Sequence, residues 1–227
     1  MMSNTKMKRN IFFAVVAVFV AVAGFTVYRV FEEPVHAEFK AGKAAYRARD
    51  FKSAVKHYKL AAEQGHIEAM FELYFCYVRG IGTDGNPDWD QALYWLHQAA
   101  ERGYAEAQAY LGVHYRDGTP GVPKDKKQAF FWFRKAADQD NITGQYMVGK
   151  CYEDGVGVDP DIAEALKWYR LAADQGNDYA QYELGKCYQE GKGVEKDMAE
   201  AVKLYRLASK QGNPRAKGAL KELNLAE

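Results

Sequence analysis

The chain has 227 residues, of which 48% are hydrophobic and 14% aromatic, a composition typical of a folded protein and not of a disordered one. Lys plus Arg number 31 and Asp plus Glu number 30, so the formal net charge at pH 7 is only +1. Nucleic-acid binding relies on an excess of positive charge, and this balance therefore argues against nucleic acid as a partner.

The first element in chain order is a basic start followed by an apolar run. Three basic residues among the first nine precede Ile11–Tyr28 (IFFAVVAVFVAVAGFTVY), which has 18 residues and no charge. This length lies between the core of a signal peptide and a membrane span. The positive charges predict that the amino terminus stays in the cytoplasm and that the remainder is exported. Residues 1–28 are interpreted as a signal sequence or signal-anchor helix, and residues 29–36 as a linker.

Two cleavage sites compete with an uncleaved anchor. Ala21-Val22-Ala23 has the small-residue pattern of a cleavage site, but a cut after Ala23 leaves an apolar tail. Val35-His36-Ala37 is the second candidate, and the charges between the apolar run and Ala37 argue against it. An uncleaved membrane anchor is slightly favoured over cleavage. The expected location is the inner membrane with the rest of the chain in the periplasm, or the soluble periplasm if the chain is cleaved after Ala23 or Ala37.

The rest of the chain repeats one unit about five times. The segment ALKWYRLAADQG, which starts at Ala165, has counterparts that start at Ala54, Ala92, Ala129 and Ala201, at intervals of 36 to 38 residues. Self-similarity at such a period is the signature of a repeat architecture.

Each unit is predicted to be a pair of helices. Upstream of the segments above runs a second pattern, A-x-x-x-[LV]-G-x-x-Y-x-x-G, whose apolar positions at i, i+4 and i+8 form one helical stripe. The pattern is visible at Ala107–Gly118, Gly144–Gly155 and Ala180–Gly191. Aspartate, which accepts hydrogen bonds from the free amides at a helix start, precedes every second helix, at Asp50, Asp88, Asp125, Asp161 and Asp197. Glycine, which tolerates a left-handed conformation, ends four of them, at Gly65, Gly103, Gly176 and Gly212.

A single helix pair cannot bury its apolar face, whereas stacked copies share a continuous interior. The glycines at Gly112, Gly149 and Gly185 are expected to let the paired helix approach closely. Aromatic residues such as Tyr152 and Trp168 are expected to fill the layer between copies.

The segments LGVHYRDGTPGV, VGKCYEDGVGV and LGKCYQEGKGV, followed by WFRKAA, WYRLAA and LYRLAS, resemble the Sel-one-like repeat, an exported relative of the tetratricopeptide repeat. The resemblance covers roughly Phe39–Asn213. The first copy is more similar to a plain tetratricopeptide unit, and the second has Tyr74 where the pattern has glycine. The resemblance implies an α/α superhelix that serves as a scaffold or peptide binder, and it implies no reaction.

The fold class expected from these patterns is all-α. It is a right-handed α/α superhelical solenoid of about five helix pairs, preceded by the transmembrane or signal helix. The repeats are placed at residues 37–213 and a C-terminal capping helix at residues 214–227.

A binding groove is predicted on the first helices of the copies. On the helix around Leu73, Phe71 and Phe75 lie opposite the core side, so this helix is either sandwiched or exposes an apolar patch. The resemblance implies that this second face lines a concave surface. The predicted partner-binding groove comprises Phe71, Phe75, Val78, Val113, Arg116, Tyr146, Lys150, Tyr182 and Lys186. It suits a partner with an apolar anchor and an acidic portion. The alternative is that Phe71 and Phe75 pack on the first copy or the linker.

Three cysteines, Cys76, Cys151 and Cys187, occupy the same position in three copies. Equivalent points in stacked helices lie roughly 9–10 Å apart, beyond the reach of a disulfide. We therefore expect three buried, unpaired thiols. No metal site is expected, because His114 is the only histidine at its repeat position and C-x-x-C is absent.

Several enzyme-like strings lack their structural context. Gly80–Gly85 matches G-x-G-x-x-G, but it joins two helices with no preceding strand. Ser53–Lys56 matches S-x-x-K without the accompanying motifs of penicillin-interacting enzymes. No catalytic residue and no cofactor is therefore predicted.

The predicted function is an exported scaffold that binds another protein or peptide through the groove. The alternative is an immunity-type protein that neutralises a toxic effector delivered to the periplasm, as the resemblance implies for small exported relatives. An enzyme is the least favoured interpretation.

Overall fold

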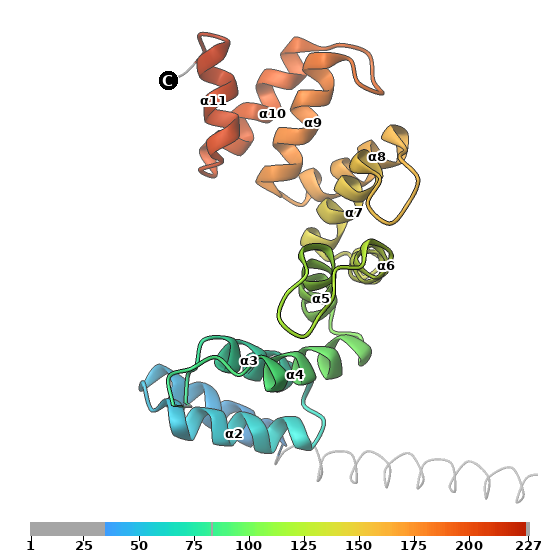
Figure 1. Cartoon of the computed structure of the whole chain (residues 1–227). Helices are drawn as coiled ribbons and strands as arrows, with labels where there is room; N and C mark the ends of the chain where they lie inside the picture. Colours follow the sequence, from blue (N-terminus) through green and yellow to red (C-terminus); the bar gives the residue numbers. More distant parts are fainter. Residues whose placement is uncertain (1–34, 83, 226–227) are drawn as a thin grey trace, which may run out of the picture. The chain divides into compact units, whose positions relative to one another are not determined.

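The computed structural model describes residues 35–82 and 84–225, and the regular elements of this part of the chain are helices (Figure 1). The extended pairing recorded there is an isolated bridge between Thr119 and Val122. The all-α expectation is confirmed for these residues. The chain divides into two compact units, one ending at Asp88 and the other beginning at Trp89.

The first unit contains a helix that runs through residues 35–47, then α2 (Phe51–Glu63) and α3 (Ile67–Val78). Gly42 faces Tyr58, which is 1% exposed, and a Cβ at Gly42 would lie 2.6 Å from Tyr58 Cδ1. The close approach expected in the later copies is therefore present in the first copy too.

The targeting prediction for residues 1–28 lies outside the described residues. The sequence assigns residues 35 and 36 to a linker, whereas the structure includes them in a helix. Of the helices in the described part of the chain, none is both long enough and apolar enough to span a membrane.

The second unit is a succession of helices, each packed against the one before it and the one after it. Its helices are α4 (Trp89–Glu101), α5 (Ala105–Asp117), α6 (Lys126–Ala137), α7 (Ile142–Asp154), α8 (Ile162–Asp174), α9 (Asp178–Glu190), α10 (Met198–Lys210) and α11 (Pro214–Glu222). The helix α11 lies within the predicted capping segment, and Asn213 caps it by accepting from the amides of Arg215 and Ala216.

Four of the five predicted aspartate caps are confirmed. Asp50, Asp125, Asp161 and Asp197 accept hydrogen bonds from amides in the first turns of α2, α6, α8 and α10. Each satisfies donors that have no partner within the helix. These side chains therefore determine where the second helices begin.

The turns after the second helices require a left-handed residue. Gly176, after α8, has φ 90°, and the next amide, that of Asn177, donates to Ala172 O at 2.9 Å. Asp140 stands at this position in the third copy and adopts φ 59°, and the amide of Asn141 donates to Ala136 O at 3.1 Å. The turn therefore keeps its shape without glycine.

The interior of the second unit continues from copy to copy. One cluster joins Phe133 of α6 to Val148 and Cys151 of α7, and the next joins Tyr169 of α8 to Leu184 of α9. The expected close approach of the paired helices at glycine is confirmed. A Cβ at Gly112, Gly149 or Gly185 would lie 2.6 to 2.9 Å from an aromatic ring of the next helix.

The tryptophans belong to this interior. Trp95 and Trp132 are 6% and 8% exposed. Trp168 is half-buried, packs against the cluster that contains Phe133, and lies under the guanidinium of Arg134, 4.9 Å from its carbon. The expected aromatic layer is therefore present.

Candidate protein-binding faces

The nine predicted groove residues lie on first helices of the copies, and all nine are half-buried. Phe71, Phe75 and Val78 come from α3 in the first unit. The other six come from the second unit, on α5, α7 and α9, and are Val113, Arg116, Tyr146, Lys150, Tyr182 and Lys186. The two sets form two candidate faces, one in each unit.

The face of the first unit is an aromatic cluster on α3. The ring of Phe71 meets that of Phe75 edge-on at 5.0 Å between centroids and stacks on Tyr74 at 6.0 Å. The guanidinium of Arg79 lies over Phe75 at 5.3 Å. Leu73, on the other side of α3, is fully buried. The two phenylalanine rings therefore cover part of one another, and each remains half-buried.

Tyrosine rings follow one another along the face of the second unit. Tyr146 of α7 lies 6.1 Å from Tyr169 and 5.9 Å from Tyr179, measured between ring centroids. Tyr182 of α9 lies 5.6 Å from Tyr205 in the same way. Tyr169 and Tyr205 are the buried aromatics that press on glycine, so Tyr146 and Tyr182 form a second layer over them.

A buried carboxylate, Glu153, is the hub of the polar part of this face. Its Oε2 accepts from Tyr169 Oη at 2.7 Å and from Lys150 Nζ at 2.9 Å, and its Oε1 accepts from Lys192 Nζ at 2.8 Å. Burial alone raises the pKa of Glu153, but the hydrogen bonds from Lys192, Tyr169 and Lys150 outweigh it and hold the pKa at about 2. The carboxylate is therefore charged at neutral pH and holds three elements together.

Glu153 is not among the nine residues predicted for the groove. The contact with Lys150 follows from helical spacing, since residues three apart share a helix face. Lys192 lies in the loop after α9, and nothing in the local sequence around Glu153 indicates that this loop reaches it.

A second buried carboxylate, Glu183, is held more loosely. Its side chain is 7% exposed, and Arg215 Nη1 donates to its Oε1 at 3.3 Å. Burial raises the pKa of Glu183, and the positive charges of Lys150, Lys186 and Arg215 only partly oppose this.

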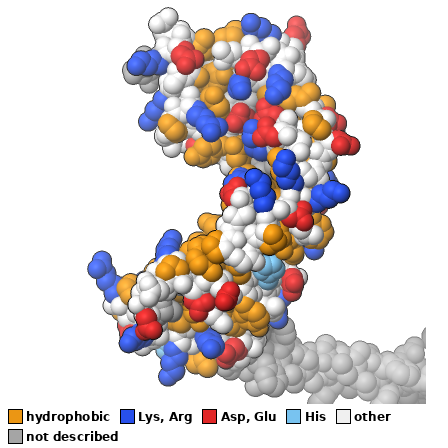
Figure 2. All heavy atoms as spheres, in the orientation of Figure 1, with side chains coloured by type: hydrophobic (Ala, Val, Ile, Leu, Met, Phe, Trp, Pro, Cys, Tyr) orange, Lys and Arg blue, Asp and Glu red, His pale blue; other side chains and the backbone are white. Residues whose placement is uncertain are grey.

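The cations of this face are already paired. Lys150 bonds to Glu153 and Asp154, and Lys186 lies 3.9 Å from Glu190. Figure 2 shows acidic and basic side chains interspersed on the visible face of the second unit. The expectation that Lys150 and Lys186 select an acidic partner is thereby weakened, because such a partner has to compete with these carboxylates.

Arg116 is likewise engaged within the chain. Its Nε and Nη2 donate to Asp117 at 2.7 and 2.8 Å, and its Nη1 lies 3.3 Å from the sulfur of Met147. Val113, one turn earlier, packs against the interior cluster around Phe133. These two residues form the floor of the face on α5.

The remaining candidates have structural roles. The amide of Ser53 donates to the Asp50 side chain, so this serine belongs to a helix cap. Cys76, Cys151 and Cys187 are buried as expected, and burial raises their pKa values to about 12, 12 and 11. In the described residues no group of three acidic, histidine or cysteine side chains is arranged to hold a metal ion.

These features define the class of the protein, a tandem α-helical repeat protein. Sel1 repeats match residues 40–66, 67–104, 105–141, 142–177 and 178–213, and the chain therefore belongs to the Sel1 repeat family. Members of this family are generally scaffolds of the protein-interaction type and not enzymes.

Among solved structures, the chain is 34% identical to c5321, a protective antigen present in uropathogenic Escherichia coli strains, with a TM-score of 0.77 over 83% of this chain and 41% of that one. It is 32% identical to a Sel1 repeat protein from Oxalobacter formigenes, with a TM-score of 0.69 over 74% and 66% of the two chains. It is 25% identical to the immunity protein PA5088 from Pseudomonas aeruginosa, with a TM-score of 0.52 over 78% and 67%.

Among curated proteins, the chain is 37% identical over 81 residues to chitin synthase regulatory factor 1 of Schizosaccharomyces pombe. This match covers 35% of this chain and 18% of the regulator. The chain thus spans less than half of c5321 and less than a fifth of the regulator.

Proposed function

We propose that the chain is an exported Sel1 repeat scaffold that binds another protein or peptide through the first-helix faces, with the aromatic face of α3 as the principal anchor. The proposal rests on the half-exposed pair Phe71 and Phe75. Large aromatic side chains, phenylalanine included, dominate the energetics of interfaces, and arginine is enriched among the residues that carry most of the binding energy. Arg79, stacked on Phe75, supplies that arginine.

The second unit contributes differently. Its tyrosine layer and its internally paired charges offer flat aromatic surface and hydrogen-bonding groups, without a strong field of one sign. Tyrosine suits such a role because it buries a large ring at a low cost in side-chain entropy. In this proposal the face of the second unit determines which partner is bound, and the α3 face supplies most of the binding energy.

The decisive test is capture with single-residue variants of α3. The full chain, carrying a C-terminal tag, is used to capture partners from an envelope extract of its source, and the captured proteins are identified by mass spectrometry. Phe71→Asp and Phe75→Asp should each weaken capture by more than about tenfold, as expected for a central aromatic anchor. Leu60→Asp is the matched control, since Leu60 is 38% exposed on α2 of the same unit.

Thermal unfolding of the same variants separates binding from packing. If Phe71→Asp and Phe75→Asp lower the midpoint far more than Leu60→Asp does, these rings belong to the core of the first unit and the binding face is misplaced. Retained stability with lost capture supports the proposal.

Export and anchoring are the second part of the proposal, and they rest on the basic start and apolar run of residues 1–28. Spheroplasts treated with protease should lose the tagged repeats if these face the periplasm and retain them if they lie in the cytoplasm. A fractionation experiment on the same cells then distinguishes membrane-anchored chain from chain cleaved after Ala23 or Ala37.

An immunity-type role is the second candidate. It is favoured by the match to an immunity protein over more than three quarters of this chain. Under this role the captured partner is a secreted toxin and not a resident envelope protein. Loss of the chain should then be harmless in isolated culture and lethal beside kin that deliver the toxin.

A further inference from the structure

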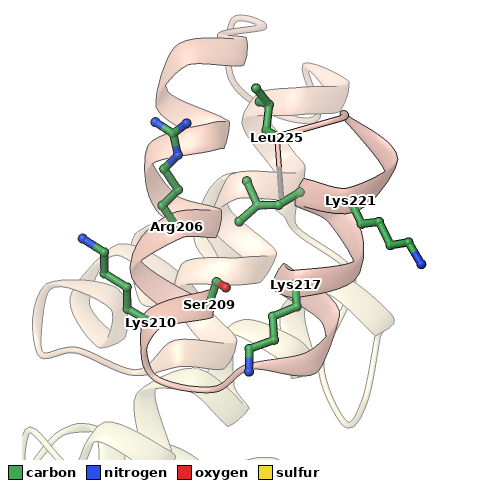
Figure 3. A pocket seen from close by; sticks show the side chains of 7 residues that line it. Arg206, Ser209, Lys210, Lys217, Lys221 and Leu225 are labelled. Atoms are coloured by element: carbon green, nitrogen blue, oxygen red, sulfur yellow. The ribbon is translucent and has the colours of Figure 1, made fainter. Parts of the chain in front are cut away.

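A further surface, distinct from the two faces described above, lies between α10 and α11. It is a cleft of about 560 Å³ lined by Arg206, Ser209 and Lys210 from α10, by Lys217, Leu220 and Lys221 from α11, and by Leu225 (Figure 3).

The cleft has a cationic rim over an apolar floor. Its four charged lining residues are all basic, all four are exposed, and none of them forms an ion pair with a described residue. Leu220 is 5% exposed and Leu225 is 38% exposed. In Figure 3 the side chains of Arg206, Lys210 and Lys221 point outward, away from Ser209.

The repeat register shows what this place is used for elsewhere in the molecule. The same positions 36 residues earlier are Arg170, Ala173, Asp174, Gln181 and Leu184, which line a smaller cleft of about 260 Å³. The helix α10 packs against α9 and lines the other side of that cleft with Glu200, Lys203, Leu204 and Leu207. The end cleft therefore corresponds to a seat on which a helix packs in the preceding copy.

Five of the seven lining positions differ from the residues 36 positions earlier, and three of these differences add positive charge. Lys210 stands where Asp174 stands, Lys217 where Gln181 stands, and Lys221 where Gly185 stands. A polar cap that stops further stacking can use uncharged polar groups or charge of either sign. Four cations with no acid among them repel one another, so capping alone does not account for their common sign.

Lys221 also decides which helix fits. In the preceding copy the ring of Tyr205 presses on Gly185, where a Cβ would lie 2.9 Å from Tyr205 Cε1. The side chain of Lys221 leaves no room for such a ring. A helix with a small residue there and acidic residues beside it fits the seat, whereas another repeat helix of the kind found in this chain does not.

We propose that the α10/α11 cleft is a docking site for an acidic amphipathic helix of a partner protein, which packs over Leu220 as α10 packs over α9. From the residues with which α10 covers its own seat, the docked helix carries an acidic residue followed by leucines four and seven positions later, as in Glu200, Leu204 and Leu207. This proposal is independent of the α3 face.

The probe is the N-acetylated, C-amidated peptide MAEAVELAELASE, which keeps the α10 pattern but has glutamate at its cationic positions and alanine at its tyrosine position. Binding of the fluorescently labelled peptide to the full chain is measured by anisotropy at low and at high salt. A scrambled peptide of the same composition controls for charge alone. We expect saturable binding of the probe that weakens as salt rises, because exposed charges are screened.

Charge reversal of the rim tests the site itself. Arg206→Glu with Lys217→Glu should weaken probe binding by about tenfold or more, from the loss of two ion pairs and the gain of two repulsions. Lys126→Glu with Lys196→Glu is the matched control, since both lysines are exposed outside the cleft and the net change in charge is the same. If circular dichroism shows that the cleft variant is unfolded, Arg206→Gln with Lys217→Gln replaces it, with a smaller loss expected.

Three outcomes overturn the proposal: no binding of the probe at low salt, equal binding of the scrambled peptide, or equal losses in the cleft and control variants. Anionic phosphatidylglycerol vesicles form a further arm. If the cleft variant loses binding to these vesicles while the probe peptide fails to bind, the rim contacts a lipid surface and the proposed helix is wrong.

Discussion

Gly112, in the middle of α5, gives the sharpest test of the packing that holds the copies together. A Cβ at this position would lie 2.6 Å from Cδ1 and Cε1 of Phe133, a ring that is fully buried on α6. Gly112→Ala gains about 1 kcal/mol of helix propensity. It overpacks the interior at a cost of about 1 to 3 kcal/mol. The net expectation is a loss of stability of up to about 2 kcal/mol.

Gly218, in α11, is the matched control within the same unit. A Cβ there would meet nothing within 4 Å. Gly218→Ala should therefore raise the free energy of unfolding by about 1 kcal/mol, the propensity gain alone. The difference between the two variants, about 1 to 3 kcal/mol, isolates the close approach because the propensity gain is common to both.

The assay is urea unfolding followed by tryptophan fluorescence, with the shift in midpoint as the measured quantity. Phe133→Leu is then added to Gly112→Ala. Leucine is smaller than phenylalanine and should relieve the overlap with the added methyl group. The double variant should therefore lose less stability than the two single losses added together. If Gly112→Ala and Gly218→Ala stabilise the chain equally, the glycine is not required by the packing and the reasoning fails.

Two further predictions concern the buried groups. Because the pKa of Glu153 is lowered to about 2, its contribution to stability is present above about pH 4.5 and is lost as the pH falls toward 2. Glu153→Gln should therefore cost roughly 1 to 3 kcal/mol at pH 7 and progressively less below pH 4.5 in unfolding experiments. Glu183 has a raised pKa, so its charged form is disfavoured by folding; Glu183→Gln should cost less at pH 7 than Glu153→Gln, and an equal cost contradicts the assignment. The thiols of Cys76, Cys151 and Cys187 should react with a thiol reagent at neutral pH only when the chain unfolds. Mass spectrometry measures the labelling, and rapid labelling of the native chain would contradict this prediction.

Those parts of the fold that depend on local spacing could be predicted from the sequence. The aspartate caps at Asp125, Asp161 and Asp197 are where the pattern put them, because a cap involves only residues two or three positions away. The glycine approach at Gly149 was predictable because it recurs at one register in several copies. Gly42 occupies the corresponding place in the first copy, but it was not predicted because that copy lacks the rest of the glycine-containing pattern.

The polar hub of the second unit was not predictable in this way. Glu153 and Lys192 are 39 residues apart, and their contact depends on how a loop of one copy folds back over a helix of another. The sequence placed Lys150 in a groove that was expected to suit a partner with an acidic portion. In the structure Lys150 forms an ion pair with Glu153, which lies three residues further along the same helix.

The positions that vary from copy to copy therefore carry the chemistry that the repeat itself does not fix. One position of the first helices is Tyr110 in α5, Met147 in α7 and Glu183 in α9, and the last two each meet an arginine from another helix. Where the interior demands glycine, α11 instead has Lys221 beside an apolar seat. Residues that keep the period account for stability, since their neighbours repeat with them. Residues that break the period are not constrained by this repeated packing, and we expect them to recognise the partner.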